Sequence, residues 1–433
     1  MSQFIVNCIR YIVTQSLYFI GGFCPRSRKA VMGCYKNKFA DNSKYLFLHW
    51  QQALTIRAIW ISGDKVLVNQ LVEQGYEAYT RWSFKGIYHA LTAKYYVYNS
   101  YIGDINQYFA RGAIKINLWH GSPLKRIEFD INNGPLFKVY HPQTLHDKFI
   151  SAAQYHQQKV RPDHMIAPSD LVARLFAGAF RISEQQMILT GNPRTDYYQA
   201  YNKSNNQGNN QGKNQIQKSQ QNIPLPDQQS LIDELKLINN VKQVILYAPS
   251  WRDSSALTTD SSNKAASANP YVNAIDFTAL SASLVDNNQL LLFRLHPNEA
   301  HLANDIQHFP NIINISDWQD TYEIINDVDL LITDYSSLYI DMLQTKADIV
   351  FFQFDQQAYQ SDSRQCYPYA DDLPMAGEVF TEFAQLNLYL SNLSQNTNIS
   401  SLTNKKNRTE LAQLYWQYQH NDCFKQLDKL VSA

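Results

Sequence analysis

Histidine, arginine and serine side chains stand at the ends of four short hydrophobic runs in this chain. The four segments are Leu118-Trp119-His120-Gly121, Tyr247-Ala248-Pro249-Ser250-Trp251-Arg252, Arg294-Leu295-His296-Pro297 and Thr333-Asp334-Tyr335-Ser336-Ser337. Each is typical of a β-strand that ends where a polar side chain begins. Open α/β sheets bind their ligands at the carboxyl ends of strands. Together the segments predict a cleft for a phosphorylated nucleotide.

Two hydroxyl groups, those of Ser336 and Ser337, lie between a buried strand and a helical pattern that runs through Leu343. Backbone N–H groups at a helix start, joined by serine hydroxyls, favour phosphate. The alternative is that one serine only caps the helix. Asp334 is expected to orient neighbouring groups, because its own charge would repel a phosphorylated donor.

Two cationic or titratable side chains, Arg294 and His296, are two residues apart and would share one face of a strand that Pro297 ends. A guanidinium and an imidazole on one side suit an anionic ligand, although a single histidine after a strand is often structural. Arg252 similarly follows the apolar run 244–248. It is expected either to bind a diphosphate or to form a surface salt bridge.

His120 is followed by Gly121, which permits a tight turn and would leave the imidazole exposed at the sheet edge. Such a histidine is suited to proton transfer near neutral pH. Lys125 lies close enough in sequence to bind an anionic acceptor, or it is simply solvated. Arg194, in the segment Gly191-Asn192-Pro193-Arg194-Thr195-Asp196, is a weaker candidate for substrate binding.

Familiar nucleotide and metal motifs are missing from the sequence. It contains neither a Gly-x-x-x-x-Gly-Lys-Ser/Thr loop nor a Gly-x-Gly-x-x-Gly loop. It also has no His-Glu-x-x-His segment and no clustered aspartates, so we predict no metal site.

The elements that would position these side chains alternate between strand-like and helix-like patterns. The first set of predicted strands covers 56–61, 76–79, 95–98, 114–119, 165–167 and 187–190. The second covers 244–248, 290–295, 311–315, 330–333 and 349–352. Amphipathic stretches separate them, as the crossovers of parallel sheets require. The pattern predicts two α/β domains.

Composition agrees with two domains and argues against binding to nucleic acid. The chain has 433 residues, 45% of them hydrophobic, which is enough for two cores. Its 38 basic residues balance 38 acidic ones, which argues against nucleic acid as a partner. Five cysteines without a Cys-x-x-Cys pair indicate reduced thiols.

Residues 202–222 hold 13 Asn or Gln among 21 positions and predict a flexible insertion. The predicted division is 1–30, 31–201, 202–222 and 223–433.

The amino-terminal segment from Phe4 to Phe23 is mostly apolar, but Asn7, Arg10 and Thr14 form a polar stripe along it. That pattern predicts an amphipathic helix, either lying on a bilayer or packed on the protein's own core, and disfavours a transmembrane span. The basic residues that follow could add attraction to an anionic membrane surface. They are Arg26, Arg28, Lys29, Lys36 and Lys38.

Taken in order, these segments resemble the CDP-glycerol glycerophosphotransferase family. The resemblance rests on Trp119 to Lys125, Gly191 to Asp196, Ile245 to Arg252, Arg294 to Pro297 and Ile332 to Ser337, with Asp41-Asn42-Ser43-Lys44-Tyr45 near the start, and spans roughly residues 25 to 390. The usual Arg-Gly after the last strand is not clear, because Arg364 is followed by Gln365 and Gly377 lies apart.

The resemblance implies two Rossmann-like domains facing a cleft, an arrangement like that of glycosyltransferase-B enzymes. It implies a peripheral enzyme of the cytoplasmic face of the inner membrane that builds teichoic acid or capsule-like polymers. The donor would be CDP-glycerol or CDP-ribitol, with no further cofactor, and the acceptor a lipid-linked saccharide or a growing polyol-phosphate chain. His120 would act as general base, and Arg252, His296, Ser336 and Ser337 would hold the diphosphate as CMP leaves. A nucleotide-sugar glycosyltransferase and a non-catalytic membrane-associated assembly factor are the alternatives.

Overall fold

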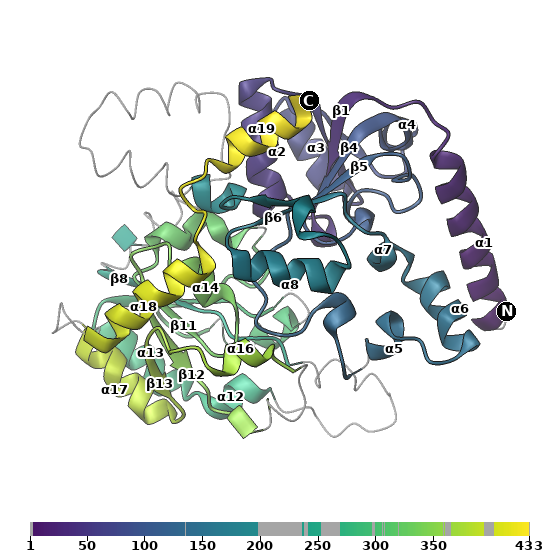
Figure 1. The fold of residues 1–433 in the computed structure, drawn as a ribbon. Coiled ribbons are helices and arrows are strands. Elements are labelled where there is room, and N and C mark those ends of the chain that lie inside the picture. Colours follow the sequence, from purple (N-terminus) through teal and green to yellow (C-terminus); the bar gives the residue numbers. More distant parts are fainter. Residues whose placement is uncertain are drawn as a thin grey trace. The chain divides into compact units, whose positions relative to one another are not determined.

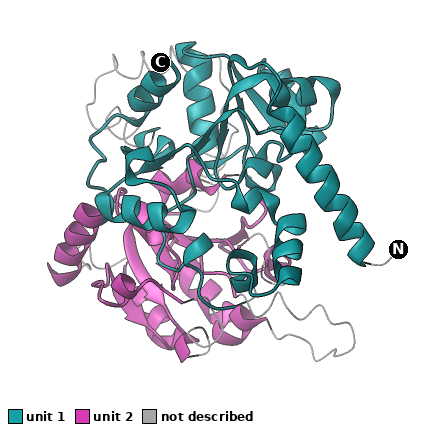
Figure 2. Cartoon of the chain, turned by 45° about the vertical axis from the view of Figure 1, so that its right-hand side comes forward, with its two compact units in different colours: residues 1–224, 415–433 teal, residues 225–414 magenta. Residues whose placement is uncertain are grey.

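The protein, described here by a computed structural model, folds into two compact units, residues 1–224 with 415–433 and residues 225–414 (Figure 2). The structure describes residues 3–134, 136–197, 236–237, 241–252, 269–296, 299–304, 306, 308–318, 320–357, 359, 365–393 and 402–432. The predicted insertion 202–222 lies outside these residues.

The first unit is built on a parallel sheet of seven strands in the order β3-β2-β1-β4-β5-β6-β7. The strands are β1 Ser27–Met32, β2 Ala58–Ser62, β3 Ala78–Thr80, β4 Ala93–Tyr98, β5 Ile114–Asn117, β6 His164–Ala167 and β7 Met187–Leu189. The order reverses between β1 and β4. Ligands of open α/β sheets bind beyond the carboxyl ends of strands at such a reversal.

Helices cover both faces of this sheet and border it (Figure 1). They are α1 Gln3–Gly21, α2 Asp41–Ala53, α3 Lys65–Glu73, α4 Phe84–Thr92, α5 Phe137–Tyr140, α6 Leu145–Gln154, α7 His156–Lys159, α8 Asp170–Phe180 and α19 Cys423–Ser432, with the 3₁₀ turns η1 Tyr35–Asn37, η2 Ile102–Asp104, η3 Glu128–Asp130 and η4 Glu184–Gln186. Several begin at side-chain caps. Asp64, Ser83 and Ser169 accept backbone N–H groups at the starts of α3, α4 and α8.

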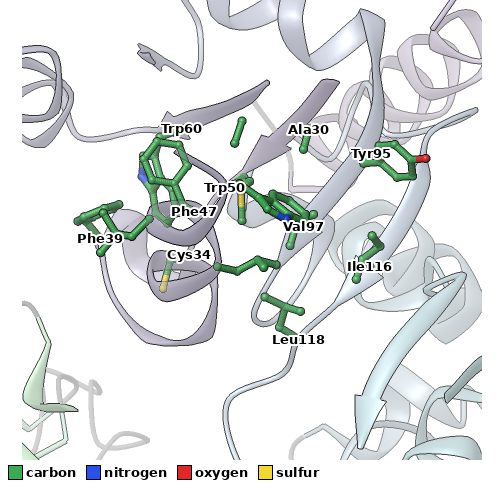
Figure 3. Packing of buried hydrophobic residues seen from close by; sticks show 14 of the residues in the cluster. Ala30, Cys34, Phe39, Phe47, Trp50, Trp60, Tyr95, Val97, Ile116 and Leu118 are labelled. Atoms are coloured by element: carbon green, nitrogen blue, oxygen red, sulfur yellow. The ribbon is translucent and has the colours of Figure 1, made fainter. Parts of the chain in front are cut away.

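A large core that is rich in aromatic side chains packs on one face of this sheet (Figure 3). Trp60 of β2 meets Phe39 and Phe47 edge to face, with ring centroids 4.7 and 5.4 Å apart. Cys423 and Leu427 of α19, both buried, belong to the same core. The last helix is therefore part of the first unit.

The second unit is a parallel sheet of six strands in the order β10-β9-β8-β11-β12-β13. Its strands are β8 Gln243–Tyr247, β9 Gln289–Phe293, β10 Ile312–Asn314, β11 Leu330–Thr333, β12 Asp348–Phe352 and β13 Glu378–Phe380. Around them lie α12 Pro270–Ala274, α13 Phe277–Asp286, η6 Ala300–Ala303, η7 Thr321–Asp327, α14 Leu338–Met342, α16 Pro368–Asp371 and α17 Phe383–Leu393, and α18 Leu402–Tyr415 leads back to the first unit. The order reverses between β8 and β11.

The prediction of two Rossmann-like α/β domains is confirmed, and eleven of the strands were expected near their observed positions. Two strands were missed. Strand β13 has only three residues, and β1 begins with Ser27, Arg28 and Lys29, which disguise the buried run from Ala30 to Met32.

Two of the domain boundaries differ from the predicted ones. Because β1 pairs with both β2 and β4, residues 27–30 belong to the centre of the first sheet and not to a separate terminal segment. Residues 415–433 belong to the first unit, although the sequence placed them in the C-terminal domain. The last helix, α19, packs against residues that lie hundreds of positions earlier in the sequence. No local sequence pattern therefore indicates that it belongs to the first unit.

Candidate active site

His120 lies in the loop after β5, at the carboxyl edge of the first sheet, and its side chain is exposed as expected. Its Nδ1 is 3.1 Å from the carbonyl oxygen of Asn99, which follows β4. A carbonyl oxygen can only accept, so Nδ1 carries the proton and the lone pair of the neutral ring is on Nε2. This tautomer presents a proton acceptor at Nε2.

Three buried asparagines shape the backbone that leads to His120. Asn42 donates from Nδ2 to the carbonyl oxygens of Leu118 and Trp119, at 3.3 and 2.9 Å. Asn117 accepts the N–H of Trp119 at 2.9 Å and donates to Ser100 at 3.1 Å. Asn99 accepts from the N–H and hydroxyl of Ser43. These bonds join α2, β4 and β5 around the histidine.

Arg194 has a role different from the predicted one. Its side chain is fully buried and forms an ion pair with Asp41, with Nη1 and Oδ1 2.5 Å apart. Both terminal nitrogens also lie 3.3 Å from the carbonyl oxygen of His120. A guanidinium enclosed in this way supports the histidine's peptide and is not placed to receive substrate.

Lys125 is half-buried in the segment that follows His120. This segment is fixed at Glu128, a buried carboxylate that accepts hydrogen bonds from the hydroxyls of Tyr101, at 2.7 Å, and Tyr140. The loop is therefore tied to η2 on one side and α5 on the other, which restricts where Lys125 can reach.

In the second unit, the three predicted segments meet at the carboxyl edge of the sheet. Arg252, after β8, binds Asp334, after β11, with Nη1 and Oδ2 2.6 Å apart. It also binds Asp355, after β12, through Nε and Nη2 at 2.8 and 3.0 Å. The segments after β8, β11 and β12 therefore meet at one edge of the sheet.

The same contacts change the role of Arg252. It is buried, and two carboxylates and four aromatic rings surround its guanidinium. Burial alone would lower its pKa, but Asp334, Tyr271 and Asp355 raise the pKa above its usual range. The structure thus does not support Arg252 as a ligand of the donor diphosphate, because its guanidinium is buried and already bound to Asp334 and Asp355.

Asp334 fixes the backbone of the loops beside it. Its Oδ1 accepts the backbone N–H of Ser250 at 2.7 Å and that of Tyr335. The helix after it, α14, has only five residues, shorter than the predicted pattern through Leu343. Ser336 accepts the N–H of Leu338 at 3.3 Å, which is the capping alternative, whereas the Ser337 side chain makes no capping bond.

Arg294 and His296 lie beyond the end of β9, which stops at Phe293, so they do not share a strand face as predicted. The strand ends early because the backbone of Leu295 bonds to the hydroxyl of Ser316, at 3.0 Å, instead of to a neighbouring strand. The imidazole of His296 stacks on Trp251, with ring centroids 5.4 Å apart and planes 16° apart. Pro297 lies outside the described residues.

The supporting residues were not found by the analysis of sequence spacing. Asp41 and Asn42 lie within a segment of family resemblance, and Asn99 and Asp355 lie outside every motif named from the sequence. Asn99 and Asp355 do carry a signal, since each follows a predicted strand as the chosen candidates do. Among the described residues, no group of three or more His, Cys, Asp or Glu side chains is arranged to hold a metal ion.

Comparison with known proteins completes the assignment. The family model described as CDP-Glycerol:Poly(glycerophosphate) glycerophosphotransferase matches residues 23–431. The chain belongs to this glycerophosphotransferase family. The resemblance inferred from the sequence is thereby confirmed, and the protein is a transferase.

Curated relatives of this glycerophosphotransferase cover most of its length. The teichoic acid glycerol-phosphate transferase of Staphylococcus aureus (strain NCTC 8325 / PS 47) is 27% identical over 376 residues, 86% of each chain. The teichoic acid poly(glycerol phosphate) polymerase of Bacillus spizizenii (strain ATCC 23059 / NRRL B-14472 / W23) is 26% identical over 356 residues, 81% of this chain and 80% of the relative.

A solved structure shares the fold. The wall teichoic acid polymerase TagF, in a variant soaked with CDPG, superposes with a TM-score of 0.71 at 20% identity, covering 99% of this chain and 96% of that one.

Proposed function

We propose that this glycerophosphotransferase moves glycerol phosphate from CDP-glycerol to a hydroxyl of a teichoic-acid-type acceptor and releases CMP. The observation that carries the proposal is the geometry of His120, an exposed imidazole whose Nδ1 faces the Asn99 carbonyl. Membership of the family, and the glycerol-phosphate transferase and polymerase among the relatives, support the donor and the acceptor class.

In the proposed reaction, Nε2 of His120 takes the proton of the acceptor hydroxyl. The hydroxyl oxygen then forms a bond to the phosphorus that carries glycerol, and the bond from that phosphorus to the CMP oxygen breaks. CMP leaves with the electron pair. A positioned base contributes typically about 10²–10⁴-fold to such a step.

We propose that the second unit binds the donor through His296, Arg294 and Ser337, and that Lys125 contacts the anionic acceptor. Stacking on Trp251 fixes the plane of the His296 ring, which suits a donor of hydrogen bonds to phosphate. Arg252 and Asp334 act behind these groups by fixing the loops that carry them. Stabilising the charge that develops on the diphosphate is an electrostatic task for preorganised donors. No further cofactor is part of the proposal.

The deciding experiment incubates the purified protein with CDP-glycerol and a lipid-linked acceptor and measures CMP and product length. CMP release that depends on acceptor supports the proposal. CDP-ribitol serves as the matched donor, and faster turnover with it would reassign the polyol. Release of a nucleoside diphosphate from a nucleotide sugar, or no turnover with any donor, would overturn the proposal. A parallel reaction with EDTA is expected to keep its rate.

We also propose that α1 binds the surface of an anionic membrane. Among the described helices, α1 is long and apolar enough to cross a membrane by length and composition. Its orientation supports a helix lying on the surface: Asn7 and Thr14 are buried against the protein, whereas Ile9 and Ile12 are 50% and 62% exposed. Placing apolar side chains in water on one face is costly unless something covers them.

Two of the five basic residues expected to aid this binding are used inside the protein. Arg26 donates to the carbonyl oxygens of Ala90 and Ala93, at 2.9 and 3.0 Å, and to others nearby. Lys29 is buried in β1, 2.7 Å from the Thr92 hydroxyl. Charge attraction from these two residues is therefore not available to lipid, and the apolar face of α1 carries the proposal.

Vesicle sedimentation tests the membrane proposal. The double variant Ile9→Asp with Ile12→Asp should lose binding to vesicles that contain phosphatidylglycerol. The double variant Val66→Asp with Val72→Asp, which places the same two charges at exposed apolar positions of α3, is the matched control. Equal sedimentation of the α1 double variant and the wild type would show that α1 does not bind the bilayer.

A further inference from the structure

Two residues near His120 that are not glycine have a left-handed backbone conformation. Asp41, the first residue of α2, has φ of 61°, and Trp119, directly before His120, has φ of 48°. Left-handed conformations are unfavourable for such residues and persist only where surrounding contacts hold them. Asn42, next to Asp41, donates to the carbonyl of Trp119. This hydrogen bond links the two segments that contain the left-handed residues.

Arg194 connects these two segments by charge. Its Nη1 binds the Asp41 carboxylate, and Nη1 and Nη2 together face the carbonyl oxygen of His120 at 3.3 Å. The backbone N–H of Arg194 also donates to Oδ1 of Asn42 at 3.3 Å. The guanidinium is fully buried, and its planar set of fixed donors holds a carboxylate and a carbonyl in a defined relative geometry.

The segment that supplies Arg194 is itself tied down on its other side. Asp196 accepts the backbone N–H of Cys423 at 2.7 Å and the side-chain amide of Gln419 at 3.2 Å. Thr195 closes the turn by donating to the carbonyl of Asn192 at 2.9 Å. Arg194 therefore approaches His120 from a rigid turn and not from a loose loop.

We propose that Asp41 and Arg194 are positioning residues that hold the His120 peptide so that Nδ1 stays on the Asn99 carbonyl and Nε2 is the nitrogen that takes the acceptor proton. The inference rests on the proposed function of His120 as general base. Without the pair, the carbonyl of His120 loses the guanidinium that faces it, the peptide can rotate, and the ring can leave Asn99. A small displacement of a catalytic group costs about 10²-fold in rate.

The test combines a spectroscopic and a kinetic measurement on the full chain. Imidazole nitrogen shifts of ¹⁵N-histidine protein, assigned by loss of the signal in His120→Asn, report which ring nitrogen is protonated. In Arg194→Met and in the milder Asp41→Asn, we expect the His120 signals to move toward a mixture of tautomers. The kcat for CMP release should fall by about 10²-fold, with the KM for CDP-glycerol unchanged.

The matched control is Lys115→Met, which removes an ion pair to Asp163, 2.7 Å from Nζ to Oδ2, at the opposite end of β5. It should lower the unfolding temperature without moving the His120 signals or kcat. Unchanged His120 nitrogen shifts in a folded Asp41→Asn or Arg194→Met protein would overturn the positioning role. If His120→Asn keeps full turnover, the proposed function fails instead, while the nitrogen shifts still decide what the pair does.

Discussion

The Nδ1 atom of His120 faces the carbonyl oxygen of Asn99 across 3.1 Å, and this one contact assigns the two ring nitrogens different tasks. His120→Gln removes the base and should lower kcat by about 10²–10⁴-fold. Calorimetric binding of CDP-glycerol should change little, since the donor contacts are assigned to the second unit. A large loss of donor affinity with unchanged kcat would contradict the assignment.

Arg252 provides a test between a structural and a substrate-binding guanidinium. Arg252→Leu would leave Asp334 and Asp355 without their buried counter-charge, and breaking such a pair typically costs about 3–5 kcal/mol. Denaturant unfolding should show that loss. Adding Asp355→Asn should restore part of it, because one of the two uncompensated charges is gone. A stable Arg252→Leu protein that only loses donor affinity would return Arg252 to the diphosphate site.

His296 should behave differently from Arg252. Its ring lies on Trp251 and is half-buried, so His296→Ala removes little packing. We expect weaker donor binding and slower turnover together, with an unfolding temperature close to that of the wild type. Trp251→Leu, which removes only the stacking surface, should raise the KM for CDP-glycerol less than His296→Ala does. Normal kinetics of His296→Ala would exclude a donor contact.

Gly377 occupies a position where the sequence suggested a broken family motif, and the structure gives the residue a packing role. A Cβ atom there would lie 1.6 Å from the carbonyl oxygen of Ile349 in β12. Gly377→Ala should therefore push β13 away and destabilise the second unit by about 1–3 kcal/mol, as overpacking does. Gly178→Ala, whose Cβ would meet nothing closer than an Asp130 carboxylate oxygen at 3.2 Å, should cost less.

The sequence predicted the sheets better than it predicted the chemistry of individual charges. Strands such as β8 and β11 are continuous apolar runs, and the polar residues after them necessarily reach one sheet edge. Whether an arginine there meets substrate depends on partners far away in sequence: Asp355 for Arg252 and Asp41 for Arg194. Lys29 shows the converse, a charged residue inside a buried strand whose partner, Thr92, is on a separate helix. Such pairings are set by tertiary packing.

His156 makes the first unit sensitive to acid. It is buried in α7, 3.4 Å from the Gln15 amide of α1, and burial lowers its pKa to about 4 from an ordinary value of 6.5. The unfolded chain therefore binds a proton below about pH 6.5 that the folded protein does not accept until about pH 4. The contribution of His156 to stability is fully present above pH 6.5 and is lost as the pH falls toward 4. This contribution amounts to about 3 kcal/mol at 1.36 kcal/mol per pKa unit.

The pH dependence of unfolding in urea checks this. His156→Gln should lose part of the decline between pH 6.5 and 4. Some decline should remain, because burial and Lys29 also lower the pKa of His89 to about 4. The exposed His146 in α6 supplies the control, since His146→Gln should keep the wild-type profile. If His156→Gln and His146→Gln follow the same curve, the acid sensitivity does not come from the buried imidazole at the α1–α7 contact.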